Sequence, residues 1–200
     1  MDKYTLQTNV GQSSIGLQIY KFDKEGYADG SKANTFRYLV PITSDPPELG
    51  GTPDTIEITE ADSKVRQYVN DRTDSPQFEL SYNFDANGNN YNRIKTHTSP
   101  TVADIFLLLL PLGSAFMVKS TVSNWMSGGN PIQGTMALAQ QDEAIFIPNL
   151  TDELADLDEG EKVAEWLGIT VGTQTLADLI DFDSMPAGRE TEAVKEAVKA

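Results

Sequence analysis

Residues 46–84 read PPELGGTPDTIEITEADSKVRQYVNDRTDSPQFELSYNF, a loop rich in proline and glycine followed by strand-like sequence. In the last part, Phe78, Leu80, Tyr82 and Phe84 alternate with polar residues. This period of two is typical of a β-strand with one buried face. Proline fixes φ and glycine accepts positive φ, so the loop holds a shape without joining a sheet. The stretch predicts a loop at 43–55 and strands at 56–59, 64–69 and 76–84.

The rest of the chain before residue 148 also alternates between short apolar runs and turn signals. Strands are predicted at 14–22, 36–42, 104–110, 115–126 and 132–147, the last with a break near 140–143, and a short helix within 85–95. Many strands joined by short turns favour a sandwich or a barrel. We therefore expect a mainly β domain over residues 1–147, with two packed sheets or a barrel, one short flanking helix and a polar N-terminal arm at 1–13.

After Pro148 the spacing of apolar residues becomes helical. Leu150, Leu154 and Leu157 follow this spacing, and Gly168 is placed as a C-terminal helix stop. This part carries 13 acidic and 4 basic residues, out of 30 and 15 in the whole chain. Both changes predict a boundary near Pro148. We expect residues 148–200 to form an acidic, partly helical extension that lies beside the main domain as a satellite.

The composition excludes several classes of function. The formal net charge is −15 and the sequence pI is about 4.3, whereas binding of nucleic acid through its phosphates needs clustered Lys and Arg. There are no cysteines, so disulfides and thiolate metal sites are excluded. The apolar run at 105–110 is too short to span a bilayer, and the N-terminus lacks the apolar core of a secretion signal.

Residues with catalytic or metal-binding chemistry are few. The single histidine, His97, has neither a second histidine nor a cysteine to complete a zinc site, so a surface histidine is expected. The turn at 85–90 resembles the start of a calcium loop but lacks its glycine and its closing glutamate at the required positions. Asp178, Asp181 and Asp183 are interpreted as a solvated acidic face. We expect no enzyme activity, no catalytic residue, no metal site and no cofactor.

Two aromatic residues fall out of phase with the predicted core positions. Trp125 and Tyr68 lie on polar or mixed faces of their strands. Such residues either pack against a loop or take part in subunit contacts, and the sequence favours neither alternative. An open sheet must also have its edges covered, which a ring of identical subunits can do.

Several segments in a fixed order carry a family resemblance. They are PELGGTPDTIEIT at 47–59, KVRQYV at 64–69, FELSYNF at 78–84, NYNRIK at 90–95, FMVKSTVSNW at 116–125 and IQGTMALA at 132–139. Over about residues 10–147 the chain resembles the major tail proteins, or tail tube proteins, of long-tailed phages of Gram-positive hosts. The proline- and glycine-rich loop is the specific part of this resemblance, because the strands alone would fit many β proteins.

The resemblance implies a tail-tube type β fold whose subunits form sixfold rings around a channel that conducts viral DNA without binding it specifically. Partners would be further copies of the chain and other tail proteins, such as the tape-measure and tail terminator proteins, with no membrane. The location would be the virion, after assembly in the host cytoplasm. Candidate channel-facing residues are Glu57 and Glu79. The loop at 43–55 would bridge subunits or rings through Pro46, Pro47, Glu48, Leu49, Gly50, Gly51, Thr52 and Pro53.

Two other classes of function stay open. An adhesin-like β domain of a phage or a cell surface could use its aromatic and Asn-rich turns to contact a glycan. An acidic hydrolase would need a pair of carboxylates, for which the sequence has no signature. The −15 charge suits a conduit better than a nucleic-acid binder, because an acidic wall repels a phosphate backbone.

Overall fold

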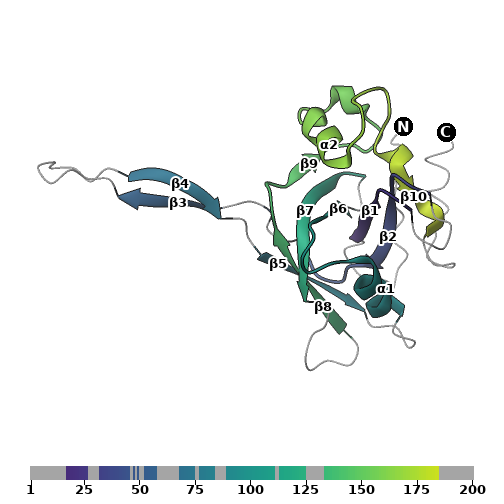
Figure 1. The fold of residues 1–200 in the computed structure, drawn as a ribbon, viewed down its shortest axis with the longest axis horizontal. Coiled ribbons are helices and arrows are strands. Elements are labelled where there is room, and N and C mark those ends of the chain that lie inside the picture. Colours follow the sequence, from purple (N-terminus) through teal and green to yellow (C-terminus); the bar gives the residue numbers. More distant parts are fainter. Residues whose placement is uncertain are drawn as a thin grey trace, which may run out of the picture.

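The computed structural model describes residues 17–26, 32–45, 47, 49, 52–57, 68–74, 77–83, 89–110, 113–124 and 133–184, with the backbone alone for 52–57, 68–74, 89, 124 and 183. Strands dominate this part of the chain (Figure 1). The strands are β1 Gln18–Asp23, β2 Thr35–Pro41, β3 Thr52–Glu57, β4 Tyr68–Asp74, β5 Gln77–Asn83, β6 Asp104–Leu109, β7 Ala115–Asn124, β8 Gln133–Gln140, β9 Ile145–Ile147 and β10 Ile180–Asp181. The helices are α1 Asn89–His97 and α2 Gly160–Leu167, with 3-10 turns η1 Leu154–Asp156, η2 Ala177–Leu179 and η3 Phe182–Ser184.

Eight strands form one curled sheet. Its order is β10-β2-β1-β6-β7-β8-β5, with β9 paired to β7, and only the β10–β2 pair among these is parallel. The far ends of the order approach each other, because Ile42 after β2 forms a bridge with Tyr82 of β5 and the Thr43 N–H donates to the Ser81 carbonyl at 2.7 Å. The prediction of a mainly β fold with a short flanking helix is confirmed. The sheet is curled toward a barrel rather than split into two equal layers.

The curl of the sheet encloses an inner apolar cluster. Alternation along β6 places Phe106 and Leu108 in it, and Ile94 reaches it from α1. The helix is held at its start by Asn90, whose side-chain amide donates to the Asn83 carbonyl at 2.8 Å. The inner cluster consists of Leu17, Ile19, Leu39, Val40, Ile42, Phe78, Leu80, Tyr82, Ile94, Phe106, Leu108, Val118, Val122, Met136 and Leu138.

The outer face of the same strands carries a second apolar cluster. Leu107 and Leu109 point to this side, opposite to their neighbours on β6. It is covered by the chain after Pro148, which contributes nearly half of the cluster. The outer cluster combines Tyr20, Phe22, Phe36, Tyr38, Leu107, Leu109, Ala115, Met117, Ile145 and Ile147 with Leu150, Leu154, Val163, Leu167, Leu176, Ala177, Leu179 and Ile180. The predicted stop is confirmed, since α2 ends at Leu167 and Gly168 caps it with φ of 67°, whereas the helical spacing of Leu150, Leu154 and Leu157 corresponds only to the 3-10 turn η1.

The segment after Pro148 is tied to the sheet by hydrogen bonds as well. The Leu150 N–H donates to the Gly113 carbonyl, β10 pairs with β2, and the Tyr38 N–H donates to the Ser184 hydroxyl at 2.9 Å. A side chain at Gly160 would meet the Leu154 carbonyl at 1.8 Å, so α2 begins in direct backbone contact with η1. The domain division at residue 148 stays a prediction, but residues 150–184 share one core with the sheet (Figure 1).

The β3–β4 hairpin projects away from this body (Figure 1). Its strands pair antiparallel from Thr52 with Asp74 to Glu57 with Tyr68, and they form a sheet of their own. Residues 52–55, which the sequence places in a loop, are therefore strand. The strand expected at 64–69 is described only from Tyr68, and it continues to Asp74, while residues 58–67 lie outside the described residues. The predicted break near residues 140–143 is confirmed, because β8 ends at Gln140 and β9 starts at Ile145.

Gly134 is the residue that allows the ring of Tyr82 to lie across β8. The two residues are cross-strand partners, and a Cβ at position 134 would lie 2.3 Å from the ring. We predict that Gly134→Ala destabilises the protein by about 1–3 kcal/mol, because overpacking displaces a buried ring. Gly172→Ala is the matched control, since nothing lies within 4 Å of its added methyl group. Urea unfolding measures both, and equal stabilities of the two variants would contradict the prediction.

Leu154 tests whether the C-terminal segment belongs to the core. Its side chain is completely buried in the outer cluster. We predict that Leu154→Ala costs about 2–5 kcal/mol of unfolding free energy, as for other buried leucines. Val171→Ala, at a site that is 38% exposed, should change stability by about 0.5 kcal/mol at most. If thermal unfolding of L154A matched that of V171A, the segment would be a dispensable satellite.

Candidate assembly surfaces

The predicted assembly loop is described only in part. Pro46, Glu48, Gly50 and Gly51 lie outside the described residues, whereas Pro47 and Leu49 are half-buried. Leu49 packs against the inner cluster. Thr52 and Pro53 are the first residues of β3 and pair with Asp74 and Thr73. The loop therefore has an anchor on the body at Leu49 and continues directly into the hairpin, and its role in subunit contacts stays a prediction.

The two predicted channel-facing residues lie on different parts of the molecule. Glu57 ends β3 of the projecting hairpin, opposite Tyr68. Glu79 lies in the middle of β5 on the main sheet, opposite Ala137 of β8, and it is exposed. The structure thus does not bring them together. Of the two aromatic residues for which packing and subunit contact were both open, Tyr68 lies at the start of β4, and Trp125 lies outside the described residues.

The outer face of β5 and β8 carries no apolar cluster. Phe78, Leu80 and Tyr82 point into the inner cluster, which leaves polar side chains of β5 on the other face. Glu79 is the one charged residue in the sequences of these two strands. The face is formed by Gln77, Glu79, Ser81 and Asn83 of β5 with Gln133, Thr135, Ala137 and Ala139 of β8. Its side chains are small or uncharged apart from Glu79.

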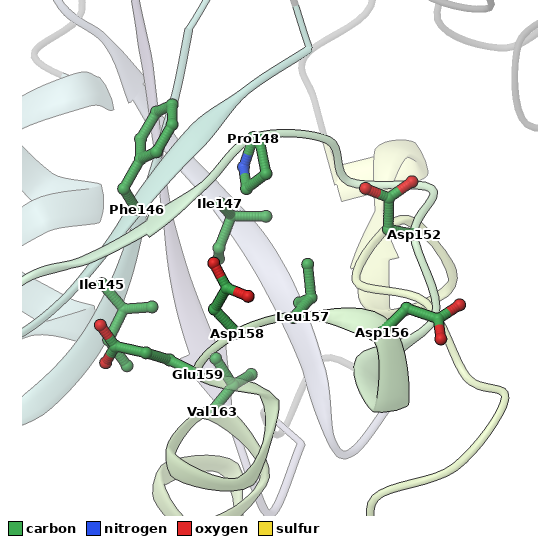
Figure 2. A pocket seen from close by; sticks show the side chains of 10 residues that line it. All are labelled: Ile145, Phe146, Ile147, Pro148, Asp152, Asp156, Leu157, Asp158, Glu159 and Val163. Carbon is green, nitrogen blue, oxygen red and sulfur yellow. The ribbon is translucent and has the colours of Figure 1, made fainter.

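A groove of about 450 Å³ opens where β9 meets the segment after Pro148 (Figure 2). Its lining combines an apolar set with four carboxylates placed around it. The apolar residues are Ile145, Phe146, Ile147, Pro148, Leu157 and Val163, and the acidic residues are Asp152, Asp156, Asp158 and Glu159. Phe146 is 53% exposed and contacts the Phe116 ring, with 5.0 Å between ring centroids. The Phe146 ring points to the opposite face of β9 from Ile145 and Ile147 and away from the four carboxylates (Figure 2).

The outer edge of β9 at this groove pairs with no other described strand. The Gln141 N–H donates to the Lys119 carbonyl, and bonding alternates along an antiparallel ladder. The backbone groups of every second residue of β7, at Lys119, Met117 and Ala115, therefore bond to β8 and β9. Phe146 lies opposite Phe116 between two of these positions, so its own N–H and C=O point away from β7. The edge is only three residues long and is followed by Pro148, features that disfavour strand addition. A partner at this groove would contact side chains rather than extend the sheet.

The polar side chains that could take part in catalysis or metal binding make ordinary contacts within the fold. His97 is the last residue of α1, and its side chain is half-buried. Asp178 accepts hydrogen bonds from the Thr175 N–H and hydroxyl at 3.0 and 2.8 Å. Burial, with a smaller contribution from Tyr91, raises the pKa of Tyr82 to about 12, so its phenol stays protonated at neutral pH. Within the described residues no group of three or more His, Cys, Asp and Glu could hold a metal ion.

No family model matches the chain, and no curated protein matches it. Among solved structures, a chain from the tail of an empty GTA particle with C6 symmetry is similar, at 12% identity and a TM-score of 0.41, covering 70% of this chain and 98% of that one. A chain of the sixfold-symmetrised baseplate of the anti-feeding prophage is also similar, at 11% identity and a TM-score of 0.37, covering 70% and 97%. At such values neither likeness assigns a function.

No helix among the described residues is long and apolar enough to cross a membrane.

Sequence reasoning missed the groove and its exposed aromatic residue. The local signal was the run Ile145-Phe146-Ile147 before Pro148. In a strand, the middle residue of such a run points to the opposite face from its neighbours. Ile145 and Ile147 are buried in the outer cluster, and Phe146 consequently lies on the other face. The sequence could indicate this opposite orientation. It could not indicate that the Phe146 side chain stays exposed in the folded chain.

Proposed function

We propose that this chain is a structural subunit that assembles with copies of itself into stacked rings, forming a tail tube of the kind found in long-tailed phages. The observation that carries the proposal is the projecting β3–β4 hairpin. Its two strands pair with each other and with no other described strand. An isolated two-stranded hairpin is marginally stable in water, and it needs a third strand or a packing surface. A neighbouring subunit would supply that surface.

The entry into the hairpin supports the same role. The proline- and glycine-rich loop, which carries the resemblance to tail tube proteins, leads from the body directly into β3. Leu49 fixes one end of this connection to the inner cluster. Because proline fixes φ and glycine accepts positive φ, we expect the loop to set the angle at which the hairpin leaves the body. The residues between Pro46 and Pro53 would then act in assembly by aiming the hairpin.

The outer face of β5 and β8 is the candidate channel wall. A wall that conducts DNA needs small, uncharged or acidic side chains, because clustered cations would retain the phosphate backbone. Glu79 is the only charged residue on these strands, and it would face the channel in this proposal. Glu57, on the hairpin, is the weaker candidate. Tape-measure and terminator proteins would be the further partners in a virion, and no catalytic step is required.

Excision of the hairpin tests the proposal. Residues 52–74 are replaced by Asn-Gly, a two-residue turn that suits antiparallel neighbours. We predict an unchanged circular dichroism spectrum of the body and a melting temperature close to that of the parent, because the hairpin is a sheet of its own. We also predict complete loss of the rings or tubes that the parent forms at high concentration, as observed by negative-stain electron microscopy.

Two outcomes would contradict the proposal. The first is a parent protein that stays monomeric at high concentration and does not associate with tail proteins. The second is an excised variant that still forms tubes of normal length, which would remove the hairpin from assembly. A monomer that instead binds glycans on an array would favour the adhesin-like alternative. Leu154→Ala is a useful comparison, because it weakens the body without touching the hairpin.

A further inference from the structure

One face of β6, β7 and β9 carries apolar side chains that reach the surface. The strand register places Leu108, Phe116 and Phe146 in one cross-strand row, and partners in such a row share a face. The centroids of the Phe116 and Phe146 rings are 5.0 Å apart. Leu110 follows Leu108 by two residues and Ala144 precedes Phe146 by two, and both pack against the inner cluster on this face. The apolar shelf is formed by Leu110, Phe116, Ala144 and Phe146.

The apolar shelf is an open continuation of the inner cluster. Phe146 is 53% exposed, and the other three members are half-buried against that cluster. A single exposed apolar side chain is ordinary, but Phe146 extends a row of buried and half-buried apolar side chains. Figure 2 shows its ring directed away from Ile145, Ile147 and the carboxylates of the groove. The shelf therefore lies on the face of β9 opposite to the acidic groove and is a single apolar surface.

The β3–β4 hairpin carries an apolar pair away from its own body. Ile56 and Val69 are cross-strand partners, so they occupy the same face of the hairpin. The opposite end of the ladder, where Thr52 pairs with Asp74, is joined to β5 by residues 75 and 76 alone. Figure 1 shows the hairpin extending away from β7 and β9. The Ile56–Val69 pair therefore lies at the outer end of the described hairpin, away from the shelf of its own chain.

The charges beside the shelf and along the hairpin have opposite sign. Residues 64–72, KVRQYVNDR, contain three basic residues and one acidic residue, which gives a net charge of +2 in a chain of −15. Asp142 and Glu143 directly precede Ala144 of the shelf. Lys162 lies 3.8 Å from Asp142, whereas Glu143 is exposed and has no ion pair among the described residues. The acidic rim of the shelf thus complements the basic returning strand of the hairpin.

We propose that the apolar shelf receives the β3–β4 hairpin of a second copy of this chain, with the Ile56–Val69 pair packed on Phe146. The hairpin is the occupant because it needs a packing surface, carries its apolar pair outward and has the charge that matches Glu143. Hairpin and shelf are different surfaces of one molecule, so the contact is heterologous and repeats from copy to copy. The inference rests on the proposed function and deepens it by naming the surface that receives the hairpin.

Substitutions on the two surfaces test the contact in the full-length protein. Phe146→Asp should raise the critical concentration for assembly about tenfold or more, measured by light scattering, because it places a charge where an apolar pair packs. Val171→Asp, at another exposed apolar site outside both clusters, is the matched control and should assemble as the parent does. Ile56→Asp should act like F146D. Its control is Thr55→Asp, on the opposite face of β3, which should have little effect.

A mixture of two blocked variants tests the pairing of the surfaces without requiring tubes. The variant with Asn-Gly in place of residues 52–74 keeps the shelf, and F146D keeps the hairpin. Each alone should stay monomeric at a concentration at which the parent assembles, and an equimolar mixture should form a heterodimer that grows no further, measured by sedimentation velocity. The excised variant that also carries F146D should form no dimer with F146D, because neither partner then has an intact shelf.

The outcomes separate the contact from the function on which it rests. A parent that forms tubes while F146D forms them equally well rejects the shelf and leaves the proposed function standing. Absence of the heterodimer, or self-association of the excised variant through its shelf, would also overturn the contact. A parent that stays monomeric and does not associate with tail proteins rejects the proposed function itself. The melting temperature of F146D should match that of the parent, since the substituted side chain is exposed.

Discussion

The apolar side chains of β6 point alternately to both faces of the sheet, and both faces must be kept from water. Phe106 and Leu108 are enclosed by the curl of the sheet itself, but Leu107 and Leu109 are not. Each buried leucine is worth about 1.5–3 kcal/mol, so the outer face needs a cover of its own. The chain after Pro148 supplies it with Leu150, Leu154, Val163 and further residues. The described residues of the acidic segment therefore cover the outer face of the sheet that precedes it.

The positions of the two apolar clusters also divide the sheet into two parts. Strands β1, β2, β6 and β7 are covered on both sides and carry the stability of the subunit. Strands β5 and β8 are covered on one side, and their other face is small and polar around Glu79. The hairpin β3–β4 has no described cover on either face. The proposed function uses for assembly the surfaces that the core leaves open.

The sequence predicted the parts of the fold whose pattern reflects burial. The alternation from Phe78 to Phe84 and the run before Pro111 identified strands, because buried residues set their period. The full length of β4 was not predicted, since Asn70 to Asp74 are all polar and show no alternation of apolar residues. The helical spacing after Pro148 was readable, but its docking on the sheet depends on non-local contacts. The groove depends on such contacts too, because the four carboxylates look like a solvated surface in the sequence until the segment that carries them packs beside β9.

The central claim is that the β3–β4 hairpin gains its packing surface only from another subunit. Amide hydrogen exchange at residues 52–57 and 68–74, compared between dilute protein and the assembled form, tests it most directly. The account predicts weak protection in dilute protein, because an isolated hairpin opens easily, and strong protection after assembly, while amides of β6 and β7 are protected in both. Equal protection of the hairpin at both concentrations would contradict the account.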